Sequence, residues 1–205
     1  LEEFIAYVAR VSNPANQSNS LTSNKLLKYL IKNQHWSPFE MAHAVLEINT
    51  TRDIARQILR HRSFAFQEFS QRYADPTQLG FSIREARLQD TKNRQNSIES
   101  SDEELEYLWK EKQLRVINAA TDAYTFAINN GIAKEQARSV LPEGNTNSRL
   151  YMAGTIRSWI HYILLRAGNG TQKEHRDIAI KASAVFTEQL PSLSEIVFDE
   201  DTGKI

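Results

Sequence analysis

The chain has 205 residues, of which 40% are hydrophobic and 24% charged, and its 25 Lys and Arg balance its 25 Asp and Glu. This balance argues against a polybasic nucleic-acid binder, and no apolar run approaches the roughly 20 residues of a membrane span. Because the chain has no cysteine, disulfide frameworks, cysteine-based metal sites and cysteine nucleophiles are excluded. We expect one cytoplasmic domain over residues 1–205, with no nucleic-acid or membrane partner.

The first part of the chain predicts a helix, a strand and a second helix. Residues 22–33 place apolar side chains at helical spacing behind a Ser/Thr/Asn start, and residues 35–39 interrupt the helix. Loose apolar alternation over residues 41–50 indicates a strand. Thr50 with Asp53 then resembles a capping arrangement, which predicts the start of the next helix.

The middle of the chain is irregular and is followed by a long helix. Residues 63–90 are rich in aromatic side chains, with strands expected around 69–74 and 80–88. Residues 101–104 (Ser-Asp-Glu-Glu) form a strong capping box, and helical periodicity follows as far as Asn130. Gly131 is a typical helix stop.

The last part of the chain alternates helices with one extended segment. We expect a short helix over 133–140, an extended segment over 145–154 and a helix over 155–166. Thr171 and Glu174 predict the cap of a final helix that ends near Gln189. This predicted content, mostly helix with a few short strands, favours the α+β class, with an antiparallel sheet flanked by helices.

The densest group of candidate functional residues is cationic: Arg52, Arg56, Arg60, His61, Arg62 and Arg72. Its first three arginines are spaced by four residues, so a helix would line them on one face, where like charges repel. A bound anion is one interpretation, and a helix C-terminus that favours cations is the other. Arginine suits phosphate, because its planar fork binds two oxygens and stays charged.

A second cationic set belongs to the helix expected over 155–166. Arg157 and His161 lie one turn apart and Arg166 falls in the last turn, while Arg138 precedes them. A solvated helix end explains this set by itself. Two separate arginine sets in a neutral protein nevertheless favour a ligand with several negative groups, such as a nucleotide.

Metal sites and the common phosphate loops are not supported. Glu40-x-x-His43 is half of a di-iron helix pattern, but it falls in a strand-like run. Glu174 and His175 are adjacent, so they face different sides of a helix, and we expect them at the surface. No glycine-rich dinucleotide or P-loop motif and no G-x-S-x-G elbow is present. We predict no metal.

A gapless R-H-R-x7-S pattern runs from Arg60 to Ser70. It resembles the signature of the flavin-dependent thymidylate synthases, and it fixes four residues in eleven positions. The resemblance extends through Ser37-Pro38-Phe39-Glu40, residues 137–142, the Arg157–Arg166 segment and as far as Glu174. The segment Ala9-Arg10-Val11-Ser12 also fits, and since a strand usually precedes it in this family, we expect that strand before Leu1.

The resemblance implies FAD-dependent reductive methylation of dUMP to dTMP, with methylenetetrahydrofolate as carbon donor and NADPH as reductant. It also implies a homotetramer whose sites are shared between subunits, and a single domain of this family over residues 1–205. An enzyme without cysteine cannot add a thiolate to the uracil ring, which agrees with a flavin route.

The site residues follow from the same resemblance. Arg166 takes the position that ionises or polarises the uracil, and is the expected catalytic residue. The residues expected to bind dUMP are Gln57, Ile58, Leu59, Arg60, Glu68, Phe69, Ser70, Gln71, Arg72, Arg138 and Arg166. Those expected to bind FAD are Arg60, His61, Arg62, Glu68, Thr155, Ile156, Arg157 and His161.

Ser70 is expected to bind the nucleotide rather than to attack it, because no general base is evident beside it. If its segment were extended, Glu68, Ser70 and Arg72 would share one face. The chain departs from the family at Met41 and Gly170, where many members have histidine, and at Thr155 and His161, where many have asparagine.

Two other functions fit the arginine sets. One is a non-catalytic nucleotide- or RNA-binding module, which would carry no flavin. The other is a metal-dependent nucleotide hydrolase, which would need ordered carboxylate ligands and would lose activity to a chelator.

Overall fold

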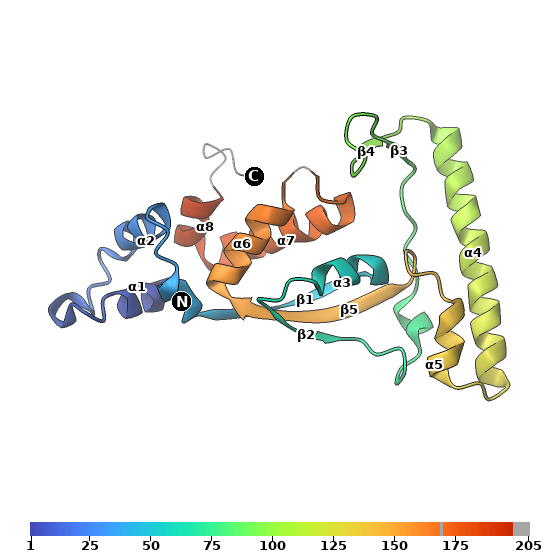
Figure 1. Cartoon of the computed structure of the whole chain (residues 1–205), viewed down its shortest axis with the longest axis horizontal. Coiled ribbons are helices and arrows are strands. Elements are labelled where there is room, and N and C mark those ends of the chain that lie inside the picture. The colour runs from blue at the N-terminus through green and yellow to red at the C-terminus, as the bar shows by residue number, and fades with distance from the viewer. Residues whose placement is uncertain (169, 199–205) are drawn as a thin grey trace. The chain divides into compact units, whose positions relative to one another are not determined.

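The computed structural model describes residues 1–168 and 170–198, which fall into two compact units (Figure 1). The first unit comprises Leu1–Leu46, His61–Ala65 and the chain from Met152 onward, and the second comprises Glu47–Arg60 and Phe66–Tyr151. The two units are interleaved along the chain, and the single domain expected over residues 1–205 stays a prediction.

The first unit is mainly helical. Its helices are α1 (Glu2–Ala9), α2 (Ser23–Lys32), α6 (Ile156–Arg166), α7 (Lys173–Gln189) and α8 (Pro191–Val197), with short 3-10 turns η1 (Pro14–Asn16) and η2 (Ser37–Glu40). Helix α7 packs against α6 and α8, and α2 packs against α1 and α8. The fully buried side chains that join these helices include Ile5, Leu27, Phe39, Trp159 and Ile163. Burial of these apolar side chains between the helices stabilises the unit.

The second unit contains the long helix and most of the irregular chain. Its helices are α3 (Arg52–Ile58), α4 (Glu103–Asn129) and α5 (Lys134–Ala137), with 3-10 turns η3 (Pro76–Leu79) and η4 (Arg138–Val140). Tyr124, Ala127, Ala137 and Leu141 form a buried cluster between α4, α5 and the turn after them, against which Phe81 packs. This cluster attaches the short α5 to the long helix.

The strands form two sheets. Strands β1 (His43–Thr51), β5 (Asn147–Thr155) and β2 (Ala65–Glu68) make a three-stranded sheet in the order β1-β5-β2. Strands β3 (Arg87–Gln89) and β4 (Ser97–Glu99) pair antiparallel, with Leu88 opposite Ile98. Every second residue of β5, from Ser148 to Gly154, is buried, which is the two-residue period of a strand with one covered face. The predicted α+β class is confirmed.

Most of the predicted elements are confirmed. Helices α2, α4 and α6 and strands β1 and β5 begin and end within about two residues of the predicted positions, whereas the helix predicted over 133–140 is divided into α5 and the 3-10 turn η4. The start of α4 is capped by Asp102, whose carboxylate accepts a hydrogen bond from the Leu105 backbone N–H at 2.9 Å. Gly131 follows the helix with a φ of 75°, a conformation that favours glycine.

The two strands predicted over 69–74 and 80–88 are wrong. Ser70 instead opens a turn, in which its carbonyl accepts hydrogen bonds from the backbone N–H groups of Tyr73 and Ala74. Within 80–88 only an isolated bridge at Phe81 and the start of β3 are extended. Short-range hydrogen bonds to serine compete with strand pairing, and alternation of apolar residues does not reveal them.

The predicted caps of two helices are displaced. Strand β1 continues one residue further than predicted, so Thr51 rather than Thr50 precedes α3. Gln172 rather than Thr171 precedes α7, and its side chain makes no capping hydrogen bond. Helices α1 and α8 were not predicted, although Pro191 at the first position of α8 is a typical start signal.

Gly154 in β5 leaves room for an aromatic ring. A Cβ atom at this position would lie against the Phe64 ring, 2.6 Å from its Cε1 atom, and that ring packs edge-on against Trp159 with a centroid distance of 4.9 Å. The ring is held by its neighbours, so it has little freedom to move away.

We therefore expect Gly154→Ala to lower the free energy of unfolding by about 1–3 kcal/mol, because the core is overpacked. Gly144→Ala is the matched control, since nothing lies within 4 Å of the added methyl group. Its free energy of unfolding should stay within about 0.5 kcal/mol of the parent value. Urea titration of both variants measures the two changes, and an equal loss in both would refute this explanation.

Candidate functional site

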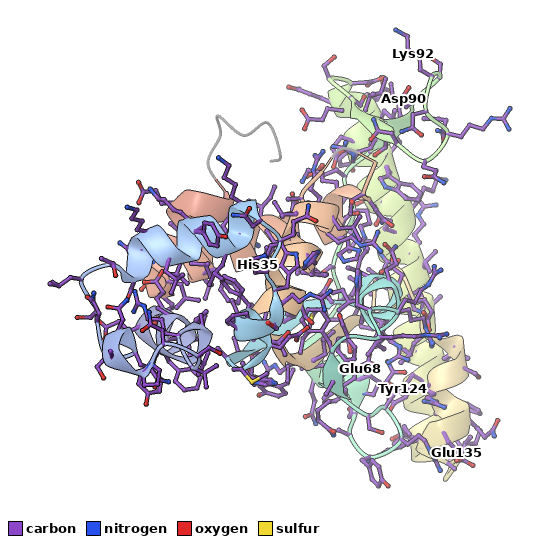
Figure 2. The ribbon with its side chains drawn as sticks, turned by 60° about the vertical axis from the view of Figure 1, so that its left-hand side comes forward. His35, Glu68, Asp90, Lys92, Tyr124 and Glu135 are labelled. Atoms are coloured by element: carbon purple, nitrogen blue, oxygen red, sulfur yellow. The ribbon has the colours of Figure 1, made fainter. Side chains whose placement is uncertain are left out.

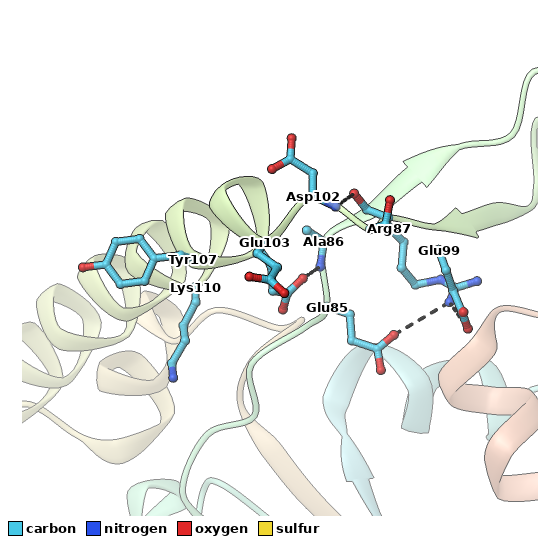
Figure 3. A pocket seen from close by; sticks show the side chains of 11 residues that line it. Glu85, Ala86, Arg87, Glu99, Asp102, Glu103, Tyr107 and Lys110 are labelled. Atoms are coloured by element: carbon cyan, nitrogen blue, oxygen red, sulfur yellow. Dashed lines mark hydrogen bonds and ion pairs between the residues drawn. The ribbon is translucent and has the colours of Figure 1, made fainter.

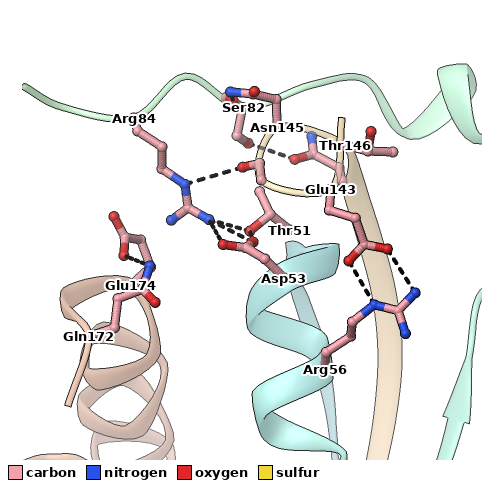
Figure 4. Close-up of polar contacts among 12 residues, drawn as sticks. Thr51, Asp53, Arg56, Ser82, Arg84, Glu143, Asn145, Thr146, Gln172 and Glu174 are labelled. Carbon is pink, nitrogen blue, oxygen red and sulfur yellow. Dashed lines mark hydrogen bonds and ion pairs between the residues drawn. The ribbon is translucent and has the colours of Figure 1, made fainter. Parts of the chain in front are cut away.

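Two arginines of α3 are neutralised by glutamates of the protein itself. The Arg56 guanidinium donates two hydrogen bonds of 2.7 Å to the Glu143 carboxylate (Figure 4). Arg52 lies 3.7 Å from Glu143 and 3.5 Å from Glu68. The pKa of Glu143 is lowered, chiefly by its hydrogen bond from Arg56. The negative charge expected beside the row of arginines is therefore supplied in part by Glu143 of the protein itself.

Arg60 and Arg62 are a different case. Helix α3 ends at Ile58, so Arg60 is not on the helix face that carries Arg52 and Arg56. Both Arg60 and Arg62 are exposed, and neither side chain makes a hydrogen bond or an ion pair within residues 1–168 and 170–198. Of the motif's cations, these two remain available to an external anion.

The turn after β2 presents Ser70 and Gln71. The Ser70 hydroxyl accepts a 3.4 Å hydrogen bond from the Arg72 backbone N–H, so Glu68, Ser70 and Arg72 do not share a strand face as predicted. Gln71 is only 4% exposed, and its side-chain Nε2 has no hydrogen-bond partner within the described part of the chain. A buried amide without a hydrogen-bond partner lowers the stability of the fold, and a polar ligand that accepted a hydrogen bond from it would remove this cost.

Helix α5 brings Arg72 and Arg138 to the same carboxylate-bearing residue. Arg72 lies 3.4 Å from the carboxylate of Glu135, which is labelled in Figure 2, and Arg138 Nε donates to the Glu135 carbonyl at 3.3 Å. The Lys134 ammonium group donates to the Tyr73 carbonyl at 2.9 Å, which attaches the helix to the turn. Two residues expected to bind dUMP, 66 positions apart in sequence, thus meet at one place.

Glu68 is held by polar neighbours in the same unit. Its carboxylate accepts a hydrogen bond from the buried Ser148 hydroxyl at 2.8 Å, in addition to its ion pair with Arg52. Ser148 is on the covered face of β5 and Arg52 begins α3. These two contacts determine where the Glu68 side chain lies.

In the first unit, the start of α6 gathers three of the residues expected to bind FAD. The Thr155 hydroxyl accepts a hydrogen bond from the Ser158 backbone N–H at 3.1 Å and caps the helix. Arg157 donates to Glu40 at 2.6 Å, and this bond is the main cause of the lowered pKa of Glu40. The His161 ring lies 4.8 Å from the Trp36 ring, and partial burial and then Arg157 lower its pKa.

The end of α6 holds Arg166 against a buried ring cluster. Arg166 Nε donates to His61 Nε2 at 2.9 Å. The His61 ring meets the Tyr162 ring edge to face, 4.9 Å between centroids, and Tyr162 OH lies 3.1 Å from His175 Nε2. Burial raises the pKa of Tyr162, so its hydroxyl stays protonated, and burial followed by Arg166 lowers the pKa of His175 to about 4.

The residues predicted to bind dUMP and those predicted to bind FAD belong mostly to different units. The dUMP set lies in the second unit, apart from Arg166, and most of the FAD set lies in the first unit, apart from Arg60 and Glu68. Ile58 and Ile156 have fully buried side chains, so a ligand could reach only their main chain. The Ile156 N–H already donates to the Ala42 carbonyl.

Several polar residues of these clusters were missed by sequence reasoning. Glu135 and Glu143 lie in no motif, and Glu40, although it belongs to the Ser37-Pro38-Phe39-Glu40 motif, gives no sign in the sequence of its pairing with Arg157. The surface position expected for His175 is wrong, because it is 0% exposed. It lies on the buried stripe of α7 with Ala179, Ala182 and Phe186, and that helical spacing is a signal that could have located it.

A cavity of about 760 Å³ lies beside the start of α4 and the β3–β4 hairpin (Figure 3). It is lined by acidic residues with Arg87, Tyr107 and Lys110, and by none of the predicted site residues. Within residues 1–168 and 170–198, no three His, Cys, Asp or Glu side chains are grouped as metal ligands. No helix in this described part is long and apolar enough to cross a membrane.

Comparison with known proteins covers nearly the whole chain. The family described as "Thymidylate synthase complementing protein" matches residues 1–192. A probable flavin-dependent thymidylate synthase of Paramecium bursaria Chlorella virus 1 is 50% identical over 95% of this chain and 89% of that protein. The flavin-dependent thymidylate synthase of Synechocystis is 50% identical over 94% of this chain and 87% of that protein.

The fold also has solved counterparts. A UMP/dUMP methylase PolB from Streptomyces cacaoi, bound with 5-Br dUMP, superposes with a TM-score of 0.83 over 95% of this chain and 89% of that chain. At 24% sequence identity, this likeness shows the fold alone.

The buried His175 leads to a pH dependence of stability. Unfolded, its imidazole takes up a proton near pH 6.5, whereas the folded protein resists protonation down to about pH 4. The stabilisation is thus complete above pH 6.5 and is lost as the pH falls toward 4, by ~3 kcal/mol. Urea unfolding at pH 7.5 and pH 4.5 should show this loss in the parent protein and a loss smaller by ~2–3 kcal/mol in His175→Gln. Equal losses in both proteins would assign the effect to other groups.

Proposed function

The chain belongs to the thymidylate synthase complementing protein family, that of the flavin-dependent thymidylate synthases, and we propose that it converts dUMP to dTMP by FAD-dependent reductive methylation. In this proposal, methylenetetrahydrofolate supplies the carbon and NADPH is the reductant. The structural observation that supports it best is the division of the arginines. Within the described chain, four of the arginines that the family motif assigns to ligands, Arg60, Arg62, Arg138 and Arg166, have no carboxylate partner, whereas Arg72 and Arg157 are paired with Glu135 and Glu40.

The chemistry of the available donors fits FAD. A dinucleotide carries a pyrophosphate, and the exposed Arg60 and Arg62 offer planar forks that bind two phosphate oxygens. Thr155, Arg157 and His161 at the start of α6 add a hydroxyl, a guanidinium and a ring that packs edge-on against Trp36. FAD, when bound and reduced, supplies the hydride and mediates the one-carbon transfer.

The turn after β2 and the segment after α5 fit a nucleoside monophosphate. Arg72 and Arg138 place two guanidinium groups beside Glu135, so a phosphate could accept from both. Ser70 adds a hydroxyl and Gln71 adds the buried amide whose Nε2 has no partner in the described chain. We propose that Ser70 and Gln71 donate hydrogen bonds to dUMP, together with Gln57, Arg60 and the segment from Glu68 to Arg72.

Arg166 is the proposed catalytic residue. Its Nε is occupied by His61, while its Nη groups make no hydrogen bond within residues 1–168 and 170–198, so they remain for the uracil. A guanidinium stays charged at all physiological pH values. Beside the uracil carbonyl and N3 it would stabilise negative charge on the ionised or polarised uracil, which makes C5 more nucleophilic toward the carbon donor.

The exposed face of α4 supports the proposed homotetramer with shared sites. Apolar side chains occupy six of the seven positions of a stripe with alternating steps of four and three, in which Lys112 is the exception: Leu105, Trp109, Val116, Ala119, Ala123 and Phe126. Val116 is 53% and Phe126 65% exposed, while a second stripe of the same helix is buried in the unit. A heptad stripe of this kind is typical of a helix that packs against another helix.

The first test is the reaction itself. The purified protein should hold FAD and form dTMP from dUMP in the presence of methylenetetrahydrofolate and NADPH. Arg166→Ala should lower kcat by 10²–10³, or ~3–4 kcal/mol, because a charge-stabilising group is removed, and FAD absorbance should remain. Arg166→Lys should also be slow, because an ammonium group cannot reproduce the planar fork.

Arg94→Ala, at an exposed position that no family motif covers, is the control and should keep the parent kcat. A protein that binds nucleotide but neither holds flavin nor forms dTMP would instead be a binding module. Near-normal kcat in Arg166→Ala would remove this residue from the reaction.

The second test concerns the α4 stripe. Val116→Glu should dissociate the tetramer, because a charge cannot be buried between apolar faces at low cost. Asn118→Glu, which adds the same charge to an exposed position outside the stripe, should leave the tetramer intact. Sedimentation velocity with circular dichroism measures assembly and folding together, and a stable Val116→Glu tetramer would place the interface elsewhere.

A further inference from the structure

Tyr162 and His175 form a buried polar pair that no assigned role uses. Tyr162 is 2% and His175 0% exposed, and their hydroxyl and Nε2 atoms lie 3.1 Å apart. Burial of two polar side chains in a helical core costs stability relative to apolar residues of similar size, unless both are satisfied. The pair is therefore worth examining for a role beyond packing.

Both residues of the pair contact the ring of His61. The His61 ring is edge-on to Tyr162, with 4.9 Å and 84° between the rings, and edge-on to His175, with 6.1 Å and 84°. Tyr162 and His175 are on different helices, α6 and α7. Contact from two helices restricts the ring in two directions, which a single neighbour cannot do.

His61 in turn holds Arg166. A guanidinium can only donate, so His61 Nε2 is the acceptor of the 2.9 Å hydrogen bond and carries no proton in this arrangement. Rotation of the His61 ring would move this acceptor away from Arg166 Nε. The direction of the guanidinium thus depends on the orientation of the ring.

We propose that Tyr162 and His175 are positioning residues, which orient the His61 ring and through it aim the Arg166 guanidinium. An uncharged pair suits this role, because a second cation beside Arg166 would repel the group that it has to hold. The proposal rests on the proposed function, in which Arg166 acts on the uracil.

The kinetic test separates positioning from packing. His175→Leu should lower kcat roughly tenfold to a hundredfold, since small displacements of a reacting group have effects of this size. The KM for dUMP should change by less than about threefold. His175→Gln, which keeps a polar group near the Nε2 position, should restore most of kcat, and Tyr162→Phe should resemble His175→Leu.

Two comparisons decide the interpretation. Phe186→Leu, on the same buried stripe of α7 and 5.5 Å from the Trp159 ring, should lower stability but keep the parent kcat. In an Arg166→Lys background, which lacks the Nε donor, His175→Leu should lower kcat no further than about twofold. The proposal is overturned if Phe186→Leu lowers kcat equally, if the Arg166→Lys background shows the full additional loss, or if His175→Leu keeps its kcat.

A readout without substrate or flavin keeps this proposal separate from the proposed function. In protein labelled with ¹⁵N at arginine and histidine, the Arg166 Nε–H should exchange at least about tenfold faster in His175→Leu than in the parent and in His175→Gln. If the parent protein forms no dTMP, the proposed function fails while this measurement still decides the positioning. Unchanged exchange in His175→Leu would overturn the proposal.

Discussion

The pairing of arginine with carboxylate organises both units. Arg56 is bonded to Glu143 and Arg84 to Asp53 (Figure 4). Arg52 also lies beside Glu143, and Arg157 is bonded to Glu40. Each of these pairs joins segments far apart in the chain, so each helps to set the position of an element. A partly buried guanidinium must find an acceptor, and arginines whose acceptor is not in the described chain can serve a ligand.

The rings at the end of α6 show a different use of polar groups. An apolar residue in place of His175 would pack in the core at less cost, and would have no protonation to resist at low pH. In the proposed positioning role, His175 beside Tyr162 and His61 lowers stability but defines the orientation of the His61 ring. Because His61 Nε2 accepts a hydrogen bond from Arg166 Nε, the orientation of the His61 ring also sets the direction of the Arg166 guanidinium.

Prediction from sequence succeeded where the signal was local and long. The capping box at 101–104 and Gly131 enclose α4, and the apolar spacing of 22–33 and 155–166 located α2 and α6. It failed at 69–74, an aromatic and irregular segment in which the Ser70 carbonyl and hydroxyl make a turn. It also placed His175 at the surface, because Glu174 and His175 were considered as an adjacent pair and the helical spacing of His175 with Ala179, Ala182 and Phe186 was not used.

The sequence by itself determined the α+β class and the family, and it supplied the proposal of which arginines and hydroxyls bind the nucleotide, because motif spacing and helical periodicity are properties of neighbouring residues. Only the tertiary structure decided which arginines are neutralised internally and which remain available, since Glu143 is 87 residues from Arg56 and Glu40 is 117 from Arg157. It alone also brought Arg72 and Arg138 to Glu135, and His61 and His175 to Tyr162. Partners at such separations are selected by packing of the whole chain, and no local pattern encodes them.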